Sequence, residues 1–440
     1  MSFRRALGTF DATMLVVGGI IGAGIFINPY LVAQRLGSGE LVLGAWVAGG
    51  AIAAAGALAF AELAALVPRA GGQYVYLYQA FHPLVGFLFG WASLLMIQGG
   101  GLAAVAITFA QYALRLAGAG PARAAGLAVA ALALLAVVNV LGVKPGSRLL
   151  NVLVVLKIAA LATLIAGGIF FAPRGAPPPA SAPAPAGGTG LSAFGAALIP
   201  ILFSYGGWQS ASVVSEEIRD SRRTLPRAIL AGTAVVVAVY VLVNVVYLGA
   251  LGREGLASTA TPAADTVART FGPGAERFLA GAIAVSTFGF LDLTLLAPTR
   301  IFYAMARDGL FFPALARLHP RFQTPAAAIL LQAAWAILLV LTGTYSDLVD
   351  SVVFADWIFF GLTVATLFVF RRRLPAGAAP GGFRAPGYPV LPALFVAAAA
   401  LVVWSAIRSN PARSAVGAAL LAAGVPVYLL FARRRPQPAA

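Results

Sequence analysis

Long apolar stretches alternate along the chain with short segments that are polar or contain glycine and proline. A helix needs about 20 apolar residues to cross a bilayer, and stretches of about 18–25 such residues recur throughout the sequence. The pattern therefore predicts an all-α polytopic membrane protein with twelve transmembrane helices. The predicted spans are 11–35, 41–66, 84–114, 124–142, 149–172, 192–214, 228–251, 275–299, 325–343, 348–370, 389–408 and 413–432.

Two of the predicted spans contain glycine-rich interruptions. Segment 18–26 in the first span has four glycines in seven positions, and segment 203–209 in the sixth has the pair Gly206-Gly207 shortly after Pro200. Each glycine disfavours a helix by roughly 1 kcal/mol relative to alanine, and an unwound turn in hydrocarbon leaves backbone groups without water. One interpretation is close packing of two helices through small residues. The other is a pair of broken helices that form a substrate site, as in inverted-repeat transporters.

Composition supports the membrane assignment and excludes several other classes of protein. Sixty per cent of the 440 residues are hydrophobic, 10% are charged, and the mean hydropathy is +0.91, whereas a soluble domain has about a quarter charged residues. The sequence has no cysteine, and its two histidines, His82 and His319, fall in predicted loops. It has no metal-ligand spacing and no phosphate-binding loop. We therefore expect no enzyme activity, no cofactor and no metal.

The net charge of +16 indicates membrane orientation rather than nucleic-acid binding, because the arginines lie in short loops between spans. Of the 30 lysines and arginines, twenty fall on the side of the predicted N-terminus and nine on the other. We expect a multi-pass protein of the cell (plasma or inner) membrane with both termini cytoplasmic. The basic start, 1–5, is similar to a signal peptide, but its long apolar continuation predicts a retained first span. Segments 371–373 and 433–435 are expected to contact anionic lipid.

Four separated stretches carry a resemblance to a known family. They are 18–26, 68–76 (PRAGGQYVY), 203–209 with its continuation to 228, and 300–313. Together they resemble the amino acid–polyamine–organocation superfamily, in particular its bacterial members and the L-type amino acid transporters. The resemblance implies a leucine-transporter-type fold with five-span inverted repeats, broken first and sixth helices, and two peripheral helices. The implied divisions are a first repeat (1–172), a flexible extracellular linker (173–190), a second repeat (191–370), and two last spans with a basic tail (371–440).

The resemblance also implies a substrate site made largely of backbone. N–H groups near Ala23, Gly24 and Ile25 would hold the substrate carboxylate, as suits the N-terminus of a half-helix. Freed carbonyls of the two interruptions would accept hydrogen bonds from the ammonium. The family usually has Ser or Thr where this chain has Ala23, and L-type members have Asn where it has Gln209. The predicted substrate-binding residues are Gly19, Ile20, Ala23, Gly24, Ile25, Phe203, Ser204, Gly206 and Leu291, with Phe203 and Trp208 as gating residues.

Lys157 lies inside the fifth predicted span, where a charge costs at least about 2.5–3.5 kcal/mol and is a functional hypothesis by default. A lysine that reaches back to the cytoplasmic surface is one interpretation. The resemblance implies another, in which Lys157 replaces a bound sodium ion and bridges the first and eighth spans through the Thr294 hydroxyl. Proton binding to Lys157 is then a possible coupling mechanism.

Five acidic residues have open roles. Asp292 is expected to pair with Lys157, help a proton to move, contact the substrate ammonium, or make a structural hydrogen bond. Asp356 is similarly ambiguous. We expect Glu62 to make a helix-end or gate contact, and Glu216 and Glu217 to form an inner-gate network or a solvated charge run.

The predicted function is secondary active transport of an amino acid by alternating access, without sodium. The predicted walls are mostly apolar (Phe203, Tyr205, Trp208, Phe288 and Leu291), which favours a neutral amino acid of small to medium size. Exchange and proton symport both remain open, as does a cationic amino acid or polyamine as substrate. A channel and a transporter-derived sensor are the alternatives from other classes. The expected partners are the substrate and membrane lipid, with no nucleic acid and no obligatory protein partner.

Overall fold

A computed structural model describes residues 7–69, 71–141, 147–171, 190–213, 215, 218–272, 274–296, 298–322, 324–343, 345–373 and 383–433. These residues form helices and no strand, apart from one isolated bridge between Leu7 and Ile218. The predicted linker lies almost wholly outside the described residues, as do Glu216 and Glu217. The helices of the first half are α1 (Thr9–Ile20), α2 (Gly24–Arg35), α3 (Gly39–Leu66), α4 (Gln73–Ala80), α5 (Pro83–Ala92), the π-helix η1 (Ser93–Ile97), α6 (Gln98–Leu116), the 3-10 turn η2 (Pro121–Arg123), α7 (Ala124–Val140) and α8 (Ser147–Phe171).

The second half continues the same all-α pattern. Its helices are α9 (Leu191–Tyr205), α10 (Ser210–Val213), α11 (Ser221–Ala257), α12 (Pro262–Phe271), α13 (Ala275–Leu296), α14 (Thr299–Arg307), the 3-10 turn η4 (Pro313–Ala316), α15 (Ala326–Thr342), α16 (Tyr345–Arg373), α17 (Val390–Ser409) and α18 (Pro411–Arg433).

Among the described residues, eight helical segments are long and apolar enough to cross a membrane. Four further apolar helices are shorter, of 10–17 residues. Each long or short apolar helix overlaps one of the predicted spans, with boundaries that differ by up to nine residues. The chain is therefore an all-α polytopic membrane protein.

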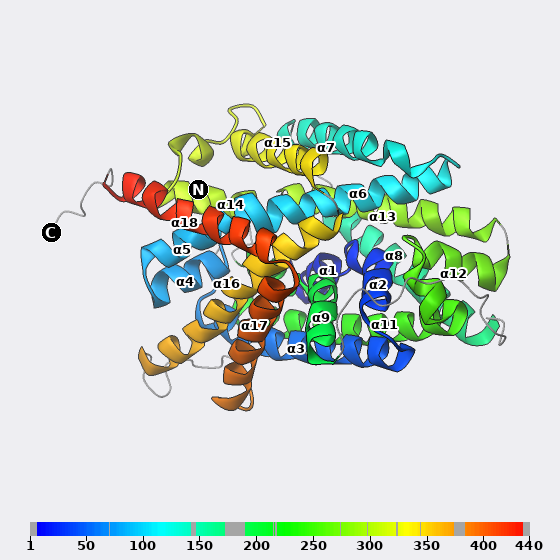
Figure 1. Cartoon of the computed structure of the whole chain (residues 1–440). Coiled ribbons are helices and arrows are strands. Elements are labelled where there is room, and N and C mark those ends of the chain that lie inside the picture. Colours follow the sequence, from blue (N-terminus) through cyan, green and yellow to red (C-terminus); the bar gives the residue numbers. More distant parts are fainter. Residues whose placement is uncertain are drawn as a thin grey trace.

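Three helices lie outside the predicted spans, because none is apolar for long enough to be found by hydropathy. They are α4, α12 and α14. Figure 1 shows α4, α14 and the end of α18 at one end of the bundle, and α12 at the other. We call the first the α14 end and the second the α12 end.

Both predicted interruptions occur. α1 stops at Ile20 and α2 begins at Gly24, and α9 stops at Tyr205 before the short α10 begins at Ser210. Figure 1 shows α1, α2 and α9 in the middle of the bundle, whereas α7 and α15 pack side by side at one margin. Backbone without a helical partner therefore lies deep inside the protein, where neighbouring helices shield it from lipid.

Candidate functional site

The two interruptions pack against each other at backbone distance. A methyl group added to Gly24 would lie 2.7 Å from the Cα atom of Ser204, and one added to Gly207 would collide with the Gly19 carbonyl. Gly207 also has a φ of +124°, which L side chains rarely adopt. The glycines thus serve both roles that the sequence left open, since they allow the helices to unwind and allow the unwound segments to touch.

Neighbouring helices satisfy the carbonyls of the first interruption. The hydroxyl of Tyr240 donates to the Ile20 carbonyl at 3.0 Å, and the Lys157 ammonium donates to the Ile21 carbonyl at 2.5 Å. One turn further on, Tyr112 donates to the Phe26 carbonyl at 2.8 Å. These donors come from α11, α8 and α6, so the unwound segment is held from three sides.

The N–H groups of the first interruption are arranged differently. Within the described chain, no backbone carbonyl accepts a hydrogen bond from the N–H of Ala23, Gly24 or Ile25. All three precede or begin α2, where N–H groups have no intrahelical acceptor. The positive end of the α2 dipole lies at the same place. Unbonded N–H groups and the dipole thus meet at the place where the resemblance implies the substrate carboxylate.

Pro200 in α9 creates a further orphan carbonyl, and side chains of α2 bond to the α9 backbone around it. Pro200 in α9 has no N–H to offer the Ala196 carbonyl, which instead accepts from Arg35 Nη1 at 2.5 Å. The buried Asn28 amide donates to the Pro200 carbonyl at 2.7 Å and to Ser204 Oγ at 2.8 Å. Arg35 also lies 3.7 Å from Asp350 of α16. These contacts tie α2, α9 and α16 together toward the α12 end.

Lys157 points at the interruption and not at the membrane surface. It is 5% exposed, and its ammonium lies 5.2 Å from the centre of the Phe290 ring in addition to its bond to the Ile21 carbonyl. The side chain thus contacts both the first span and α13. The predicted partner Thr294 has another role, because its hydroxyl donates to the Phe290 carbonyl at 2.8 Å. Asp292 accepts from the Asn139 amide at 2.6 Å, which is the structural hydrogen bond among its predicted roles.

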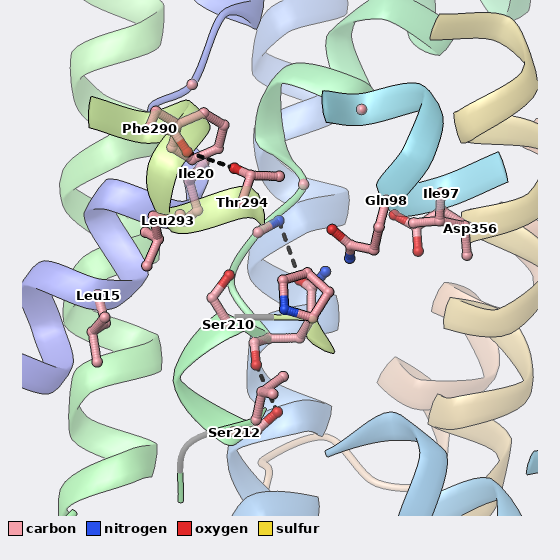
Figure 2. Close-up of a pocket in the computed structure, with 18 of the residues that line it drawn as sticks. Leu15, Ile20, Ile97, Gln98, Ser210, Ser212, Phe290, Leu293, Thr294 and Asp356 are labelled. Carbon is pink, nitrogen blue, oxygen red and sulfur yellow. Dashed lines mark hydrogen bonds between the residues drawn. The ribbon is translucent and has the colours of Figure 1, made fainter. Parts of the chain in front are cut away.

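A cavity of about 340 Å³ lies beside the two interruptions. Its wall includes backbone from both interrupted spans, together with side chains of α6, α13 and α16. Figure 2 shows Leu15 and Leu293 on one side of this cavity, and Gln98 and Asp356 on the other. A cavity of this size accommodates one small molecule of the size of an amino acid.

Several predicted site residues line this cavity. They are Gly19, Ile20, Ala23, Gly24, Phe203, Ser204, Gly206 and Thr294. Other predicted residues lie outside the described lining: Ile25, Leu291, Lys157, Asp292 and Trp208.

The predicted apolar walls therefore need a correction. Trp208 is fully buried and packs edge-on against Phe60 and tilted against Phe360, and the Tyr205 hydroxyl donates to the Trp46 carbonyl at 3.2 Å. Phe288 packs on Phe109, and Leu291 is buried in the core. None of these four residues is in the described lining of the cavity, because the rotation of each helix and the path of the turn that holds Trp208 decide which side chains face it. The aromatic side chains that do line the cavity are Phe89, Phe203, Phe290 and Trp357.

Gln98 is a lining residue that the sequence analysis missed. It follows the π-helix η1, and π-bulges in α-helices are frequent at functional sites. An amide side chain directly before three glycines in an otherwise apolar span was the available signal. Nothing in the residue types of η1 itself indicates a π-turn.

The cavity extends toward the α14 end. Its lining there includes Leu7, Asp11, Asn151, Pro298 and Arg300. Asp11 accepts from the Asn151 amide at 2.7 Å and from the Gly8 N–H at 2.9 Å. The Arg35 contacts described above lie on the other side of the interruptions, near the α12 end.

Glu62 lies in a buried ion pair at a helix end, as expected from the sequence. It is 2% exposed and accepts two hydrogen bonds from Arg371, at 2.7 and 2.6 Å, and one from the Ala385 N–H at 2.7 Å. The Arg371 guanidinium also stacks 3.9 Å from the Tyr388 ring. This arrangement connects α3, α16 and the segment before α17.

The known proteins to which this chain is similar are amino acid permeases and transporters. A family model described as "Amino acid permease" matches residues 7–431. The chain is 33% identical to the large neutral amino acids transporter small subunit 2 of Rattus norvegicus, over 98% of this chain and 81% of that protein. It is 29% identical to the serine/threonine exchanger SteT of Bacillus subtilis, over 98% of both chains. It is 30% identical to the b(0,+)-type amino acid transporter 1 of Homo sapiens, over 98% of this chain and 88% of that protein.

Proposed function

The chain belongs to the amino acid permease family, whose members are transporters and not enzymes, and from this premise we propose that it moves an amino acid across the cell membrane by alternating access. The transport is sodium-independent in this proposal, and the substrate is a neutral amino acid of small to medium size. The observation that carries the proposal is the meeting of the two unwound segments beside one cavity. A continuous helix could not offer unbonded backbone groups to a substrate there.

In the proposed binding mode, the amino acid lies with its carboxylate at the N–H groups of Ala23, Gly24 and Ile25. Its ammonium faces carbonyls near Gly19 and Gly206. The α2 dipole supports this orientation, because it places partial positive charge beside the carboxylate. Phe203 lines the cavity and is proposed to close over the substrate.

Lys157 is proposed to take the place of a sodium ion. Its ammonium supplies a positive charge at the Ile21 carbonyl, which the end of α1 leaves without a helical donor. A sodium ion would otherwise be a suitable partner for such a carbonyl. Proton binding and release at Lys157 is proposed as the route by which transport depends on pH. Asp292 and Thr294 are proposed to assist from α13, the helix whose Phe290 ring Lys157 contacts.

The proposed architecture has twelve spans, of which the first ten form two inverted five-span repeats. The repeats are 1–172 and 191–370, joined by the linker 173–190, and residues 371–440 supply the last two spans and the tail. Both termini are proposed to be cytoplasmic, so the α14 end faces the cytoplasm. Since the cavity extends toward that end, the conformation is proposed to be inward-facing.

The purified chain, reconstituted in proteoliposomes, tests the function directly. We expect saturable uptake of labelled neutral amino acids that rises when unlabelled amino acid is present inside and is unchanged when sodium is replaced by choline. Ohmic current without saturation would indicate a channel, and binding without flux would indicate a sensor. The name of the rat relative describes a small subunit. Activity of this chain alone would therefore also establish that it needs no protein partner.

A further inference from the structure

One carboxylate oxygen in the cavity wall has no hydrogen-bond partner in the described part of the chain. Asp356 lines the cavity from α16, and its Oδ1 atom is buried with no hydrogen bond to any described residue. A buried polar atom without a partner is costly, so nearly all such atoms in proteins are satisfied by protein, water or ligand. Lys157 cannot be the missing partner, because its ammonium is directed to the Ile21 carbonyl on the other side of the first interruption.

The neighbouring helix brings a second polar group to the same place. A methyl group added to Gly100 of α6 would lie 2.7 Å from Val352 Cγ2 of α16, so the two helices are in close contact at this point. Val352 and Asp356 are four residues apart and therefore share a face of α16. Gln98 lies two residues before Gly100 in α6 and also lines the cavity. Figure 2 shows Gln98 and Asp356 on the same side of the cavity.

Gln98 and Asp356 are separate from the protein groups that bind the carboxylate and ammonium of the substrate in the proposed binding mode. The carboxylate and ammonium of the substrate are accounted for by backbone of segments 18–26 and 203–209. Gln98 and Asp356 come from α6 and α16, and the remaining lining beside them is apolar, with Val353 and Trp357. The pair is therefore positioned to meet the side chain of a bound amino acid.

We propose that Gln98 and Asp356 form a side-chain subsite that selects amino acids whose side chain donates a hydrogen bond through O–H or N–H. The inference rests on the proposed transport function and narrows its substrate class. The unpartnered Asp356 Oδ1 atom can accept a hydrogen bond from an O–H or N–H group, and the Gln98 amide can both accept and donate. A hydroxyl or amino group on the substrate satisfies Asp356, whereas an apolar side chain leaves it unpartnered.

The test uses substrates that differ by one donor. Threonine and valine have nearly the same shape, and norleucine is lysine without its terminal ammonium, so the members of each pair differ by one donor group. For the reconstituted wild-type chain we expect kcat/KM for threonine to exceed that for valine by at least about tenfold, the effect of one unsatisfied buried polar group. The lysine and norleucine pair shows whether an ammonium is accepted as well as a hydroxyl.

Two variants and a control assign the preference to Asp356. Asp356→Leu should reduce the ratio between threonine and valine to near one while valine uptake persists, which also shows that the variant folds. Asp356→Asn should keep the preference for threonine and lose any uptake of lysine. Asp347→Asn carries the same change on the same helix outside the cavity, where Asp347 pairs with Arg413, and should leave both ratios unchanged.

Two outcomes would overturn the subsite. One is equal wild-type transport of threonine and valine. The other is an Asp356→Leu variant in which the two substrates fall by the same factor, since that would place the substrate ammonium and not its side chain at Asp356. If the wild-type chain transports no amino acid at all, the proposed transport function is wrong, and the subsite, which rests on it, is wrong as well. Transport without a preference for threonine would contradict the subsite alone.

Discussion

At the scale of single residues, the first interruption depends on donors supplied from other helices. The Ile20, Ile21 and Phe26 carbonyls each accept from a side chain more than 80 positions away in the sequence. Two of these donors are tyrosine hydroxyls, and only Lys157 is a charged group. A charge-assisted hydrogen bond is roughly twice as strong as a neutral one. Lys157 is therefore the donor whose loss should matter most.

Replacing Lys157 with alanine should lower the rate of amino acid exchange by more than about tenfold. The variant leaves the buried Ile21 carbonyl without a donor, and an unsatisfied buried acceptor costs about 1–3 kcal/mol. Counterflow of labelled substrate in proteoliposomes measures this rate, and its dependence on pH should change as well. Tyr240→Phe removes a neutral donor from the adjacent carbonyl and should have a smaller effect. An alanine variant with an unchanged rate and an unchanged pH profile would contradict the proposed role of Lys157.

At the scale of helices, ion pairs between elements differ widely in their surroundings. The pair of Glu62 and Arg371 is largely buried and joins α3 to α16, and Glu62 also accepts from the Ala385 N–H. The pair of Asp347 and Arg413 joins α16 to α18 with its arginine side chain 46% exposed. Breaking a buried pair leaves an uncompensated charge, whereas solvent screens an exposed one.

Glu62→Ala should therefore destabilise the protein by about 3–5 kcal/mol, seen as a lower unfolding midpoint of the purified protein in detergent. Asp347→Ala is the matched control and should cost less than about 1 kcal/mol. Equal losses of stability in the two variants would show that burial does not increase the contribution of the Glu62–Arg371 pair to stability.

At the scale of the whole molecule, the position of the cavity makes a prediction about access. The cavity extends toward the α14 end, while Arg35 bonds to the Ala196 carbonyl and lies near Asp350 toward the other end. Three helices are thus held together on the α12 side of the interruptions. Water and substrate should reach the cavity from the side on which α14 lies.

The natural absence of cysteine allows this access to be measured with a single introduced thiol. Ser210→Cys places the thiol in the cavity wall, and a membrane-impermeant reagent should label it in inside-out vesicles and not in right-side-out vesicles. A transported amino acid should slow the labelling. Adding Arg35→Leu should increase labelling from the outside, because it removes the contacts that close the α12 end. Labelling of the single variant mainly from the outside would overturn the inward-facing proposal.

The sequence by itself determined the helices and the two places where they break. Hydropathy marks each apolar helix because lipid requires about 20 consecutive apolar residues, and glycine clusters mark the breaks because they disfavour helix locally. Both signals are local, so they are visible one segment at a time. The short helices α4, α12 and α14 carry neither signal and were not predicted.

Only the tertiary structure decided which side chains face the cavity. Trp208 and Leu291 were expected in its wall and lie in the core, whereas Gln98 was not expected and lies in the wall. The residue types of an apolar span are similar on the faces that contact lipid, the core and the cavity, so the sequence does not show how the span is rotated. Packing against other helices sets that rotation. The partners of Lys157 and Asp292 were decided in the same way, because the Ile21 carbonyl and the Asn139 amide reach them from distant segments of the chain.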